Sequence, residues 1–120
     1  MTLDRFTQGY IAAALFSESD GSDDRGGEPL DKNYTENDIS PELLAVMVRD
    51  CEHFQRENEK YIGNREREAG QDFWFTRNGH GAGFWDGDWP ERAAYRLTES
   101  ARSYGEMSLY VGDDGKIYGV

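Results

Sequence analysis

Apolar residues recur at helical spacing near the start of the chain. Leu3, Phe6 and Tyr10 follow one another at intervals of three and four residues, and a run of three alanines comes soon after them. This period is typical of an amphipathic helix, and alanine has the highest helix propensity. The pattern predicts a first helix over residues 2–17, with Thr2 as its N-cap.

A longer amphipathic pattern begins at Ser40-Pro41 and ends at Gly63. Serine is a preferred N-cap, proline suits the first helical position, and glycine commonly follows the last turn. Between these signals the inward positions repeat every three or four residues: Leu44, Met47, Val48, Cys51, Phe54, Asn58, Tyr61 and Ile62. This segment is predicted to be a long helix with a charged outer face.

The period changes after Gln71. Two aromatic runs, residues 72–76 and 84–86, surround a glycine-rich Asn-Gly centre, which is typical of a β-hairpin. Residues 108–118 predict a second hairpin around an Asp-Asp-Gly turn. Residues 90–104, between the two hairpins, have the spacing of a third helix.

Helices and strands that are segregated along a chain favour an α+β fold over a parallel α/β fold. We therefore expect an α+β fold in which two N-terminal helices pack on an antiparallel sheet of about four strands. The two β-hairpins would supply these strands, with the third helix between the hairpins. The length of 120 residues fits a single domain, residues 1–120, with its own core.

Charge is the most unusual bulk property of the sequence. The chain has 24 Asp and Glu against 13 Lys and Arg, which gives a net charge of −11. This balance opposes binding to the phosphates of double-stranded DNA and to an anionic membrane surface. It favours a basic protein surface as the partner, with a long-range attraction that salt weakens. Solubility alone is an alternative reason for such charge.

Acidic residues are densest in residues 18–38. This segment carries eight acidic residues against Arg25 and Lys32, and Leu30 and Tyr34 are its only large apolar side chains. A loop of this length without secondary structure is uncommon in a compact domain and is often functional. We expect Leu30 and Tyr34 to anchor the segment as an ordered acidic loop. The predicted protein-binding residues are Glu18, Asp20, Asp23, Asp24, Glu28 and Asp31.

Cysteine use and the lack of targeting signals favour the cytoplasm. Cys51 is the only cysteine, which excludes an internal disulfide and is usual in a reducing compartment. The N-terminus lacks the basic and apolar regions of a secretory signal. The longest apolar run, residues 10–16, is too short to span a bilayer. We therefore expect a cytoplasmic protein without a membrane partner.

A second candidate site is the glycine-rich turn of the first predicted hairpin. Arg77, Asn78, His80 and Asp86 cluster around this turn, and their polar groups would suit a small anion. The glycines match neither a phosphate loop nor a dinucleotide-binding fingerprint. The alternative is structural, because small residues permit an unusual turn against aromatic packing.

The residues indicate no cofactor, metal site or activated nucleophile. His53, His80 and Cys51 do not have the spacing of a structural zinc site, and the Asp-rich turns lack the EF-hand pattern. No nucleophile elbow is present, and Cys51 lies on the apolar face of its helix, where a thiol acts as a small hydrophobe. A non-enzymatic protein is therefore favoured over an enzyme.

One long motif resembles a family of small bacteriophage and environmental viral proteins: Asp72-Phe-Trp-Phe-Thr-Arg-Asn-Gly-His-Gly-Ala-Gly-Phe-Trp-Asp86. The similarity extends upstream through residues 26–31, 33–34 and 38–39, and downstream through residues 110–118. The resemblance implies a phage-associated accessory protein in the cytoplasm of an infected bacterium. It brings no catalytic residues.

Three hypotheses about function follow from these patterns. The first is a non-enzymatic acidic protein that binds a basic surface of a host or phage nucleic-acid-binding protein, in its sharpest form by mimicking DNA. The second is a small-anion-binding domain or enzyme that uses residues 77–86. The third is a single-stranded nucleic-acid accessory protein that stacks bases on aromatic side chains. These aromatics would be Phe73, Trp74, Phe75, Phe84 and Trp85.

Overall fold

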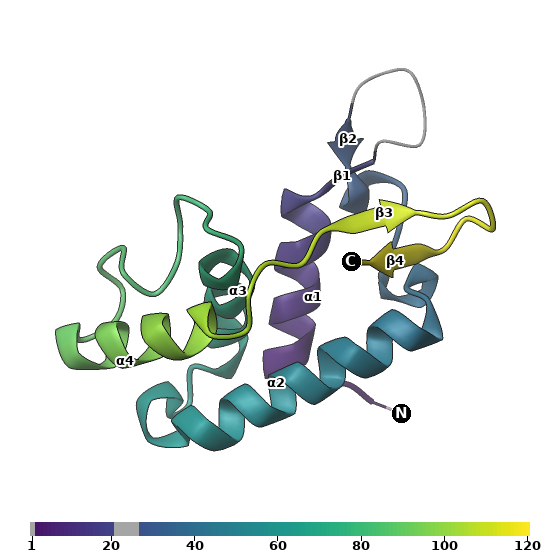
Figure 1. Cartoon of the computed structure of the whole chain (residues 1–120). Helices are drawn as coiled ribbons and strands as arrows, with labels where there is room; N and C mark the ends of the chain where they lie inside the picture. Colours follow the sequence, from purple (N-terminus) through teal and green to yellow (C-terminus); the bar gives the residue numbers. More distant parts are fainter. Residues whose placement is uncertain (1, 21–26) are drawn as a thin grey trace.

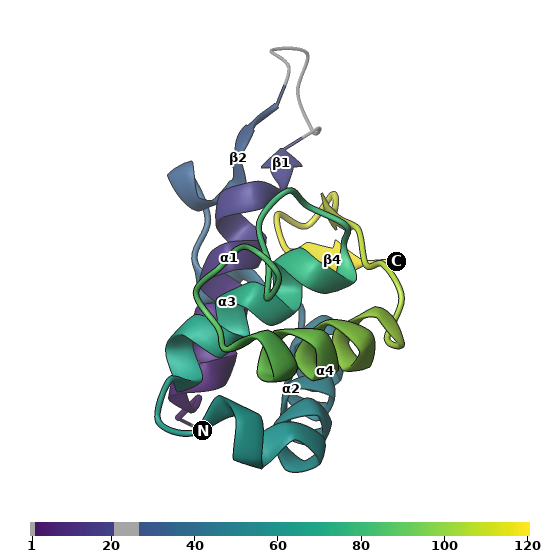
Figure 2. The same cartoon turned by 90° about the vertical axis from the view of Figure 1, so that its left-hand side faces the viewer.

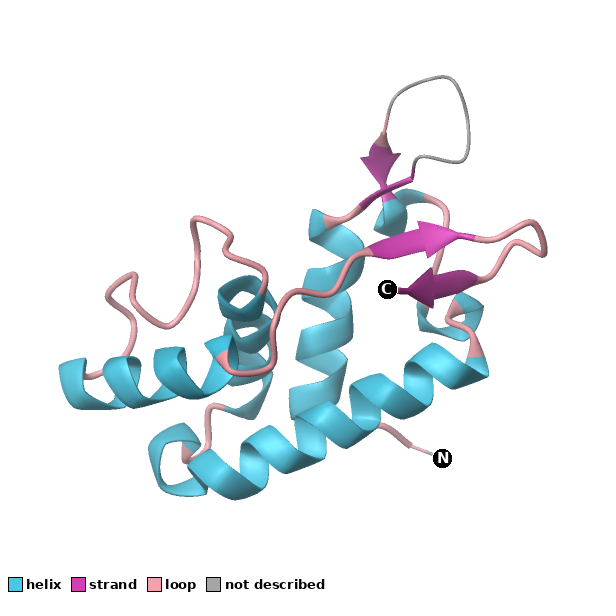
Figure 3. Ribbon diagram, viewed as in Figure 1, coloured by secondary structure: helices cyan, strands magenta, loops and turns pink. Residues whose placement is uncertain are grey.

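The computed structural model describes residues 2–20 and 27–120, except for the side chain of Asp20. Four α-helices form most of this described backbone: α1 (Arg5–Ser17), α2 (Pro41–Ile62), α3 (Glu66–Arg77) and α4 (Glu91–Arg102). Two short antiparallel pairs accompany them: β1 (Ser19–Asp20) with β2 (Glu28–Pro29), and β3 (Leu109–Val111) with β4 (Ile117–Gly119). Two 3-10 turns precede α2: η1 (Leu30–Lys32) and η2 (Glu36–Asp38). Figures 1 and 3 show this mainly helical arrangement.

The predicted α+β fold is wrong. The strands of the described residues form two separate two-stranded pairs and not one sheet of four. The N-terminal helix α1 packs along α3, and it does not cover the face of a sheet (Figure 1). The hairpin predicted at residues 72–86 does not form, because its first aromatic run belongs to α3 and its second run lies in the loop between α3 and α4.

The aromatic run of α3 is helical because helical spacing brings its apolar and small residues to one side. Ala69, Gly70, Phe73 and Trp74 lie three or four residues apart and are all buried. In a strand, Phe73 and Trp74 would point to opposite faces. The β preference of aromatic residues depends on the packing that a sheet offers, and here burial between helices outweighs it.

Helices α1, α2 and α4 and the β3–β4 hairpin lie where the hydrophobic pattern predicts them. Asp4, and not Thr2, caps α1, because its Oδ1 accepts a first-turn backbone N–H at 2.8 Å. Ser40 caps α2 as predicted, through a 3.2 Å hydrogen bond from the N–H of Leu43. Gly63 follows the last turn of α2 with a φ of 58°, a conformation that favours glycine.

Glycines allow α1 and α3 to pack with their backbones in close approach. A methyl group at Gly9 would overlap the carbonyl of Arg67, and one at Gly70 would overlap the carbonyl of Phe6. The two helices lie side by side in both views (Figures 1 and 2). This contact is the most extensive one between any two elements of the described residues.

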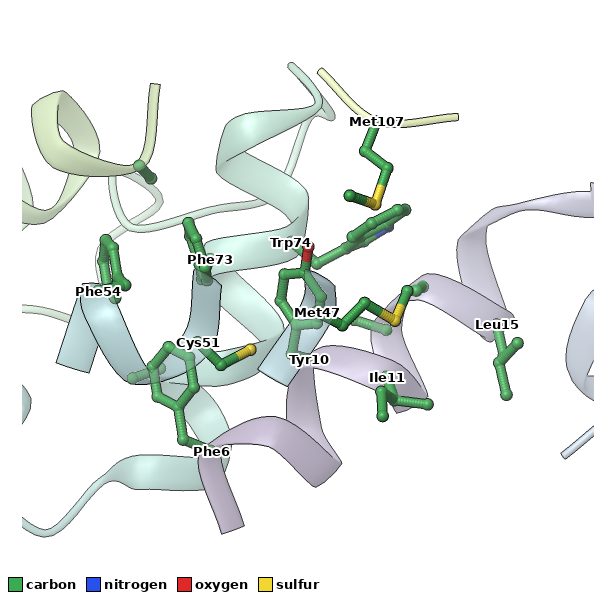
Figure 4. Packing of buried hydrophobic residues seen from close by; sticks show 14 of the residues in the cluster. Phe6, Tyr10, Ile11, Leu15, Met47, Cys51, Phe54, Phe73, Trp74 and Met107 are labelled. Carbon is green, nitrogen blue, oxygen red and sulfur yellow. The ribbon is translucent and has the colours of Figure 1, made fainter. Parts of the chain in front are cut away.

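Aromatic rings from three helices fill the centre of the molecule (Figure 4). The ring of Phe54 in α2 stacks on that of Phe73 in α3, with 4.2 Å between their centroids. Tyr10 of α1 meets Trp74 of α3 edge-on at 5.3 Å. Each such ring pair contributes about 0.5–1.5 kcal/mol beyond its buried area, so the rings join the helices as well as filling space.

Distant segments hold α2 at both ends. At its start, the backbone N–H of Ser40 donates to the carbonyl of Ile117 in β4 at 2.9 Å. Near its end, Asn58 departs from helical geometry, and its side-chain amide donates to Phe54 O at 2.9 Å and to Ser100 Oγ at 2.8 Å. The second of these bonds ties α2 to α4 and fixes the position of α4 on the body.

The contact between α1 and α3 predicts a strong effect of Gly70→Ala. The added methyl would displace the backbone of α1, so we expect the free energy of unfolding to fall by about 1–3 kcal/mol. The higher helix propensity of alanine offsets only about 1 kcal/mol. Urea denaturation followed by circular dichroism measures this change. Gly81→Ala is the matched control, because no atom lies within 4 Å of its added methyl. Equal stability of the two variants would contradict the prediction.

Candidate functional site

Arg77, predicted as an anion ligand, lies at the end of α3 with a side chain only 4% exposed. Its NH1 group donates to the hydroxyl of Tyr10 at 3.0 Å and to Oδ2 of Asp50 at 3.1 Å. Its Nε and NH2 groups donate to the carbonyls of Gly105 at 2.8 Å and Tyr104 at 3.1 Å. The guanidinium therefore joins α1, α2 and the segment after α4, and its hydrogen bonds serve the protein interior.

The other residues predicted around the glycine-rich turn have separate partners. The Oδ1 atom of Asn78 accepts the backbone N–H of Met107 at 2.8 Å, and the ring of His80 packs edge-on against Phe75 at 5.7 Å. Asp86 accepts a backbone N–H within its own turn at 3.3 Å. Within the described residues, no hydrogen bond or ion pair joins any two of the four candidates. Each of the four side chains therefore has a contact of its own.

Three of the acids predicted to bind a protein have described side chains. Glu18 accepts the backbone N–H of Leu109 at 3.0 Å, so it links the end of α1 to β3. Glu28 pairs with Lys32 at 2.9 Å, and Asp31 is exposed. The other predicted positions lie outside the description: the side chain of Asp20, and all of Asp23 and Asp24.

Residues 27–38 form a strap that lies against α1. Leu30 is fully buried and Tyr34 is half-buried, so the two predicted anchors are confirmed. The strap nevertheless has more structure than the sequence indicates, since it contains β2, η1 and η2. A capping box between Thr35 and Asp38 fixes the second turn. The strap therefore presents its carboxylates from a defined backbone.

Much of the surface negative charge of the described residues forms no ion pair. The pairs that Lys and Arg form with these carboxylates are Glu28–Lys32, Asp50–Arg77, Asp50–Arg49 and Glu68–Arg65. Among these, the Asp50–Arg77 pair is buried, whereas the exposed pairs contribute little to stability. The remaining described carboxylates leave a surplus of negative charge at the surface.

The aromatic side chains predicted to stack on bases belong mainly to the core. Phe73, Trp74 and Phe84 are fully buried, and Phe75 is half-buried. Trp85 alone of this set is exposed, at 40%. A buried ring offers no face to a nucleic-acid base, so this set does not form the stacking surface that the hypothesis requires.

A groove of about 500 Å³ runs between α4 and the loop that precedes it. Its lining comes from Trp85, Gly87 and Trp89 in the loop, and from Glu91, Ala94, Tyr95, Thr98 and Arg102 in α4. Sequence reasoning missed this groove. The available signal was Tyr95, a large aromatic residue among the polar positions of the helix predicted over residues 90–104, and it is 61% exposed.

Polar partners hold Trp89 at the wall of the groove. Its indole N–H donates to Oδ2 of Asp72 at 2.7 Å, and the guanidinium of Arg65 lies 3.9 Å from its ring centroid. The pKa of Asp72 is raised to about 6, mainly by burial and also by the carboxylates of Asp86 and Glu68, against the opposing effect of the indole hydrogen bond. Ionised Asp72 therefore destabilises the folded state near neutral pH.

The cysteine and histidine side chains show no assembled catalytic or metal-binding group. Cys51 is fully buried, as its helical position predicts, and burial raises the pKa of its thiol. Nδ1 of His53 lies 2.5 Å from the hydroxyl of Tyr104, whose pKa is raised by burial to about 12. The described residues contain no group of three or more His, Cys, Asp or Glu side chains placed to hold a metal ion.

Comparison with other proteins adds no relative to this picture. No protein-family model matches the chain, no curated protein is significantly similar to it, and no solved structure matches its fold. No helix in the described ranges combines the length and the apolar character that crossing a membrane requires. The groove, the strap and the surface charge are the features of the described residues that bear on function.

The buried position of Arg77 predicts a large effect of Arg77→Met. The substitution leaves Asp50 and two carbonyls without their donor, so we expect a loss of about 3–5 kcal/mol in the free energy of unfolding. Chemical denaturation measures the loss. Arg49→Met is the control, because Arg49 approaches the same carboxylate at 3.7 Å but is 72% exposed. A similar small effect of both substitutions would refute the structural role of Arg77.

The raised pKa of Asp72 predicts a pH-dependent effect of Asp72→Asn. The pKa of Asp72 is about 6 in the folded protein against 3.8 in the unfolded chain, so its ionisation lowers stability progressively between pH 3.8 and about 6, and by its full amount above pH 6. Because Asp72 is partly exposed, we expect the asparagine variant to be more stable by only about 1 kcal/mol at pH 7.5. Below pH 4 the two proteins should unfold alike.

Thermal or urea unfolding at several pH values tests this expectation. Asp113→Asn, in the exposed turn between β3 and β4, is the control for a general change in charge. A pH-independent difference between Asp72→Asn and the parent protein would contradict the prediction.

Proposed function

We propose that this chain is a non-enzymatic binding protein that attaches to a basic surface of a partner protein. The observation that carries the proposal is the surplus of surface carboxylates without a neighbouring cation, in a chain of net charge −11. Such a field attracts a cationic surface over a distance of about 10 Å at moderate salt. The same field repels nucleic-acid phosphates and anionic lipids.

The strap of residues 27–38 is the proposed contact surface. It has four carboxylates against Lys32, and Asp31 and Glu36 are exposed. Its anchoring by Leu30 supports a role in binding, because acids on a fixed backbone lose less conformational freedom when they meet a partner.

A nucleic-acid-binding protein is the proposed class of partner. Surfaces that bind phosphates gather Lys and Arg, and a strongly acidic protein competes for them. The resemblance to bacteriophage proteins supports a host protein as the target, in the cytoplasm of an infected bacterium. In its sharpest form the proposal is mimicry of DNA, in which carboxylates occupy the places of phosphates.

Affinity capture with the tagged protein from nuclease-treated bacterial lysate tests this function. We expect a nucleic-acid-binding protein to be retained at low salt, released at high salt and displaced by added DNA. Substituting Asp31→Lys together with Glu36→Lys should weaken retention at least about tenfold, because it reverses charge within the strap.

The matched control is Glu52→Lys with Glu59→Lys, which makes the same change of charge at two exposed residues of α2, outside the strap. Retention lost equally in both pairs would assign binding to total charge and not to the strap. Retention that salt and DNA do not affect would overturn the proposed function.

A further inference from the structure

The groove beside α4 is built from aromatic side chains that are already held in place. The guanidinium of Arg102 lies 5.5 Å from the ring centroid of Trp85, and the hydroxyl of Tyr95 donates to Glu99 at 2.9 Å. Trp89 is held by its indole hydrogen bond to Asp72. Rings fixed before binding lose little conformational entropy on binding, and tryptophan and tyrosine dominate the energetics of protein interfaces.

The charges of the groove differ between its two ends. Glu91 lines one end and Arg102 the other, and neither forms an ion pair within the described structure. Asp86 and Asp88 alternate with the lining residues of the loop and are exposed. The charges of Asp86 and Asp88 act on Asp72 beside Trp89, where the cation Arg65 pairs with Glu68, whereas Arg102 lies against Trp85 at the other end.

The other cations of α4 belong to a different surface. Arg92 and Arg96 line a hollow between α4 and α2, together with Lys60. Their guanidinium groups therefore do not line the aromatic groove, although the charge of Arg96 reaches the hydroxyl of Tyr95. A helix rises 1.5 Å per residue, so Glu91 and Arg102 are about 16 Å apart along α4, the length of about five extended residues.

We infer that this groove is the docking site for an extended segment of the partner protein. The segment inserts an apolar or aromatic side chain between Trp85 and Tyr95 and places a Lys or Arg beside Glu91. This inference rests on the proposed function, because it assigns the basic partner a second, short-range contact. The charge of the acidic end selects the basic residue, and the fixed rings select the apolar one.

Three acetylated and amidated hexapeptides of equal length test the groove in NMR titrations at low salt. The first probe has two lysines next to Phe-Leu, the second has two lysines next to Gly-Ser, and the third has two glutamates next to Phe-Leu. We expect the first probe to bind about tenfold more tightly than either of the others. Its binding should shift the indole N–H signals of Trp85 and Trp89.

Substitution of the groove aromatics provides the second readout. Trp85→Ala and Tyr95→Ala should each weaken the first probe about tenfold, and the two variants check one another should either fold poorly. Tyr110→Ala is the matched control, because Tyr110 is a 50% exposed aromatic side chain on β3 and should leave binding unchanged.

Several results would overturn the inference and leave the proposed function in place. Equal binding of both lysine probes, with no effect of Trp85→Ala, would show that basic segments bind without the groove. Tightest binding of the glutamate probe would assign recognition to Arg102 instead. Failure of the lysate capture, by contrast, would remove the proposed function itself, whatever the peptides do.

Discussion

A single buried cation, Arg77, sets the arrangement of the helices. An unpaired guanidinium in a protein interior costs several kcal/mol, so the loss of its partners would destabilise the fold. These partners come from α1 through Tyr10, from α2 through Asp50, and from the segment after α4 through two backbone carbonyls. Displacing any one of these elements would leave charge or hydrogen-bonding groups unsatisfied in the interior.

The groove depends on the same arrangement. Arg77 fixes the end of α3 against the residues that follow α4, so the loop between these helices must start and finish at set positions. The hydroxyl of Thr76 in α3 also holds the loop, because it accepts the N–H of Phe84 at 3.2 Å. Asp72 then holds Trp89 at the groove wall, although this position raises the pKa of its carboxyl. The ionised carboxylate of Asp72 is unfavourable at this position, but its hydrogen bond orients the ring of Trp89.

The sequence predicted those features that depend on local signals, and it failed where distant contacts decide. Ser40 and Gly63 mark the ends of α2 through local backbone chemistry, so that helix could be read from the sequence. The aromatic run at Phe73 suits a strand and a helix equally, and burial of Gly70, Phe73 and Trp74 on one side of α3 favours the helix. Likewise, Arg77 resembles a ligand-binding residue until its partners, 27 to 67 residues away, are known.

Surface charge and the groove would act at different stages of recognition. A surplus of carboxylates spread over a whole chain raises the rate of encounter with any basic protein, but it distinguishes poorly among them. Selection requires short-range features, and the rings of Trp85 and Tyr95 that line the groove are such features. The strap lies against α1 whereas the groove follows α4, so one partner would have to contact two separate surfaces. Under this proposal, the surface charge raises the rate of association with the partner, and the groove provides the specificity of binding.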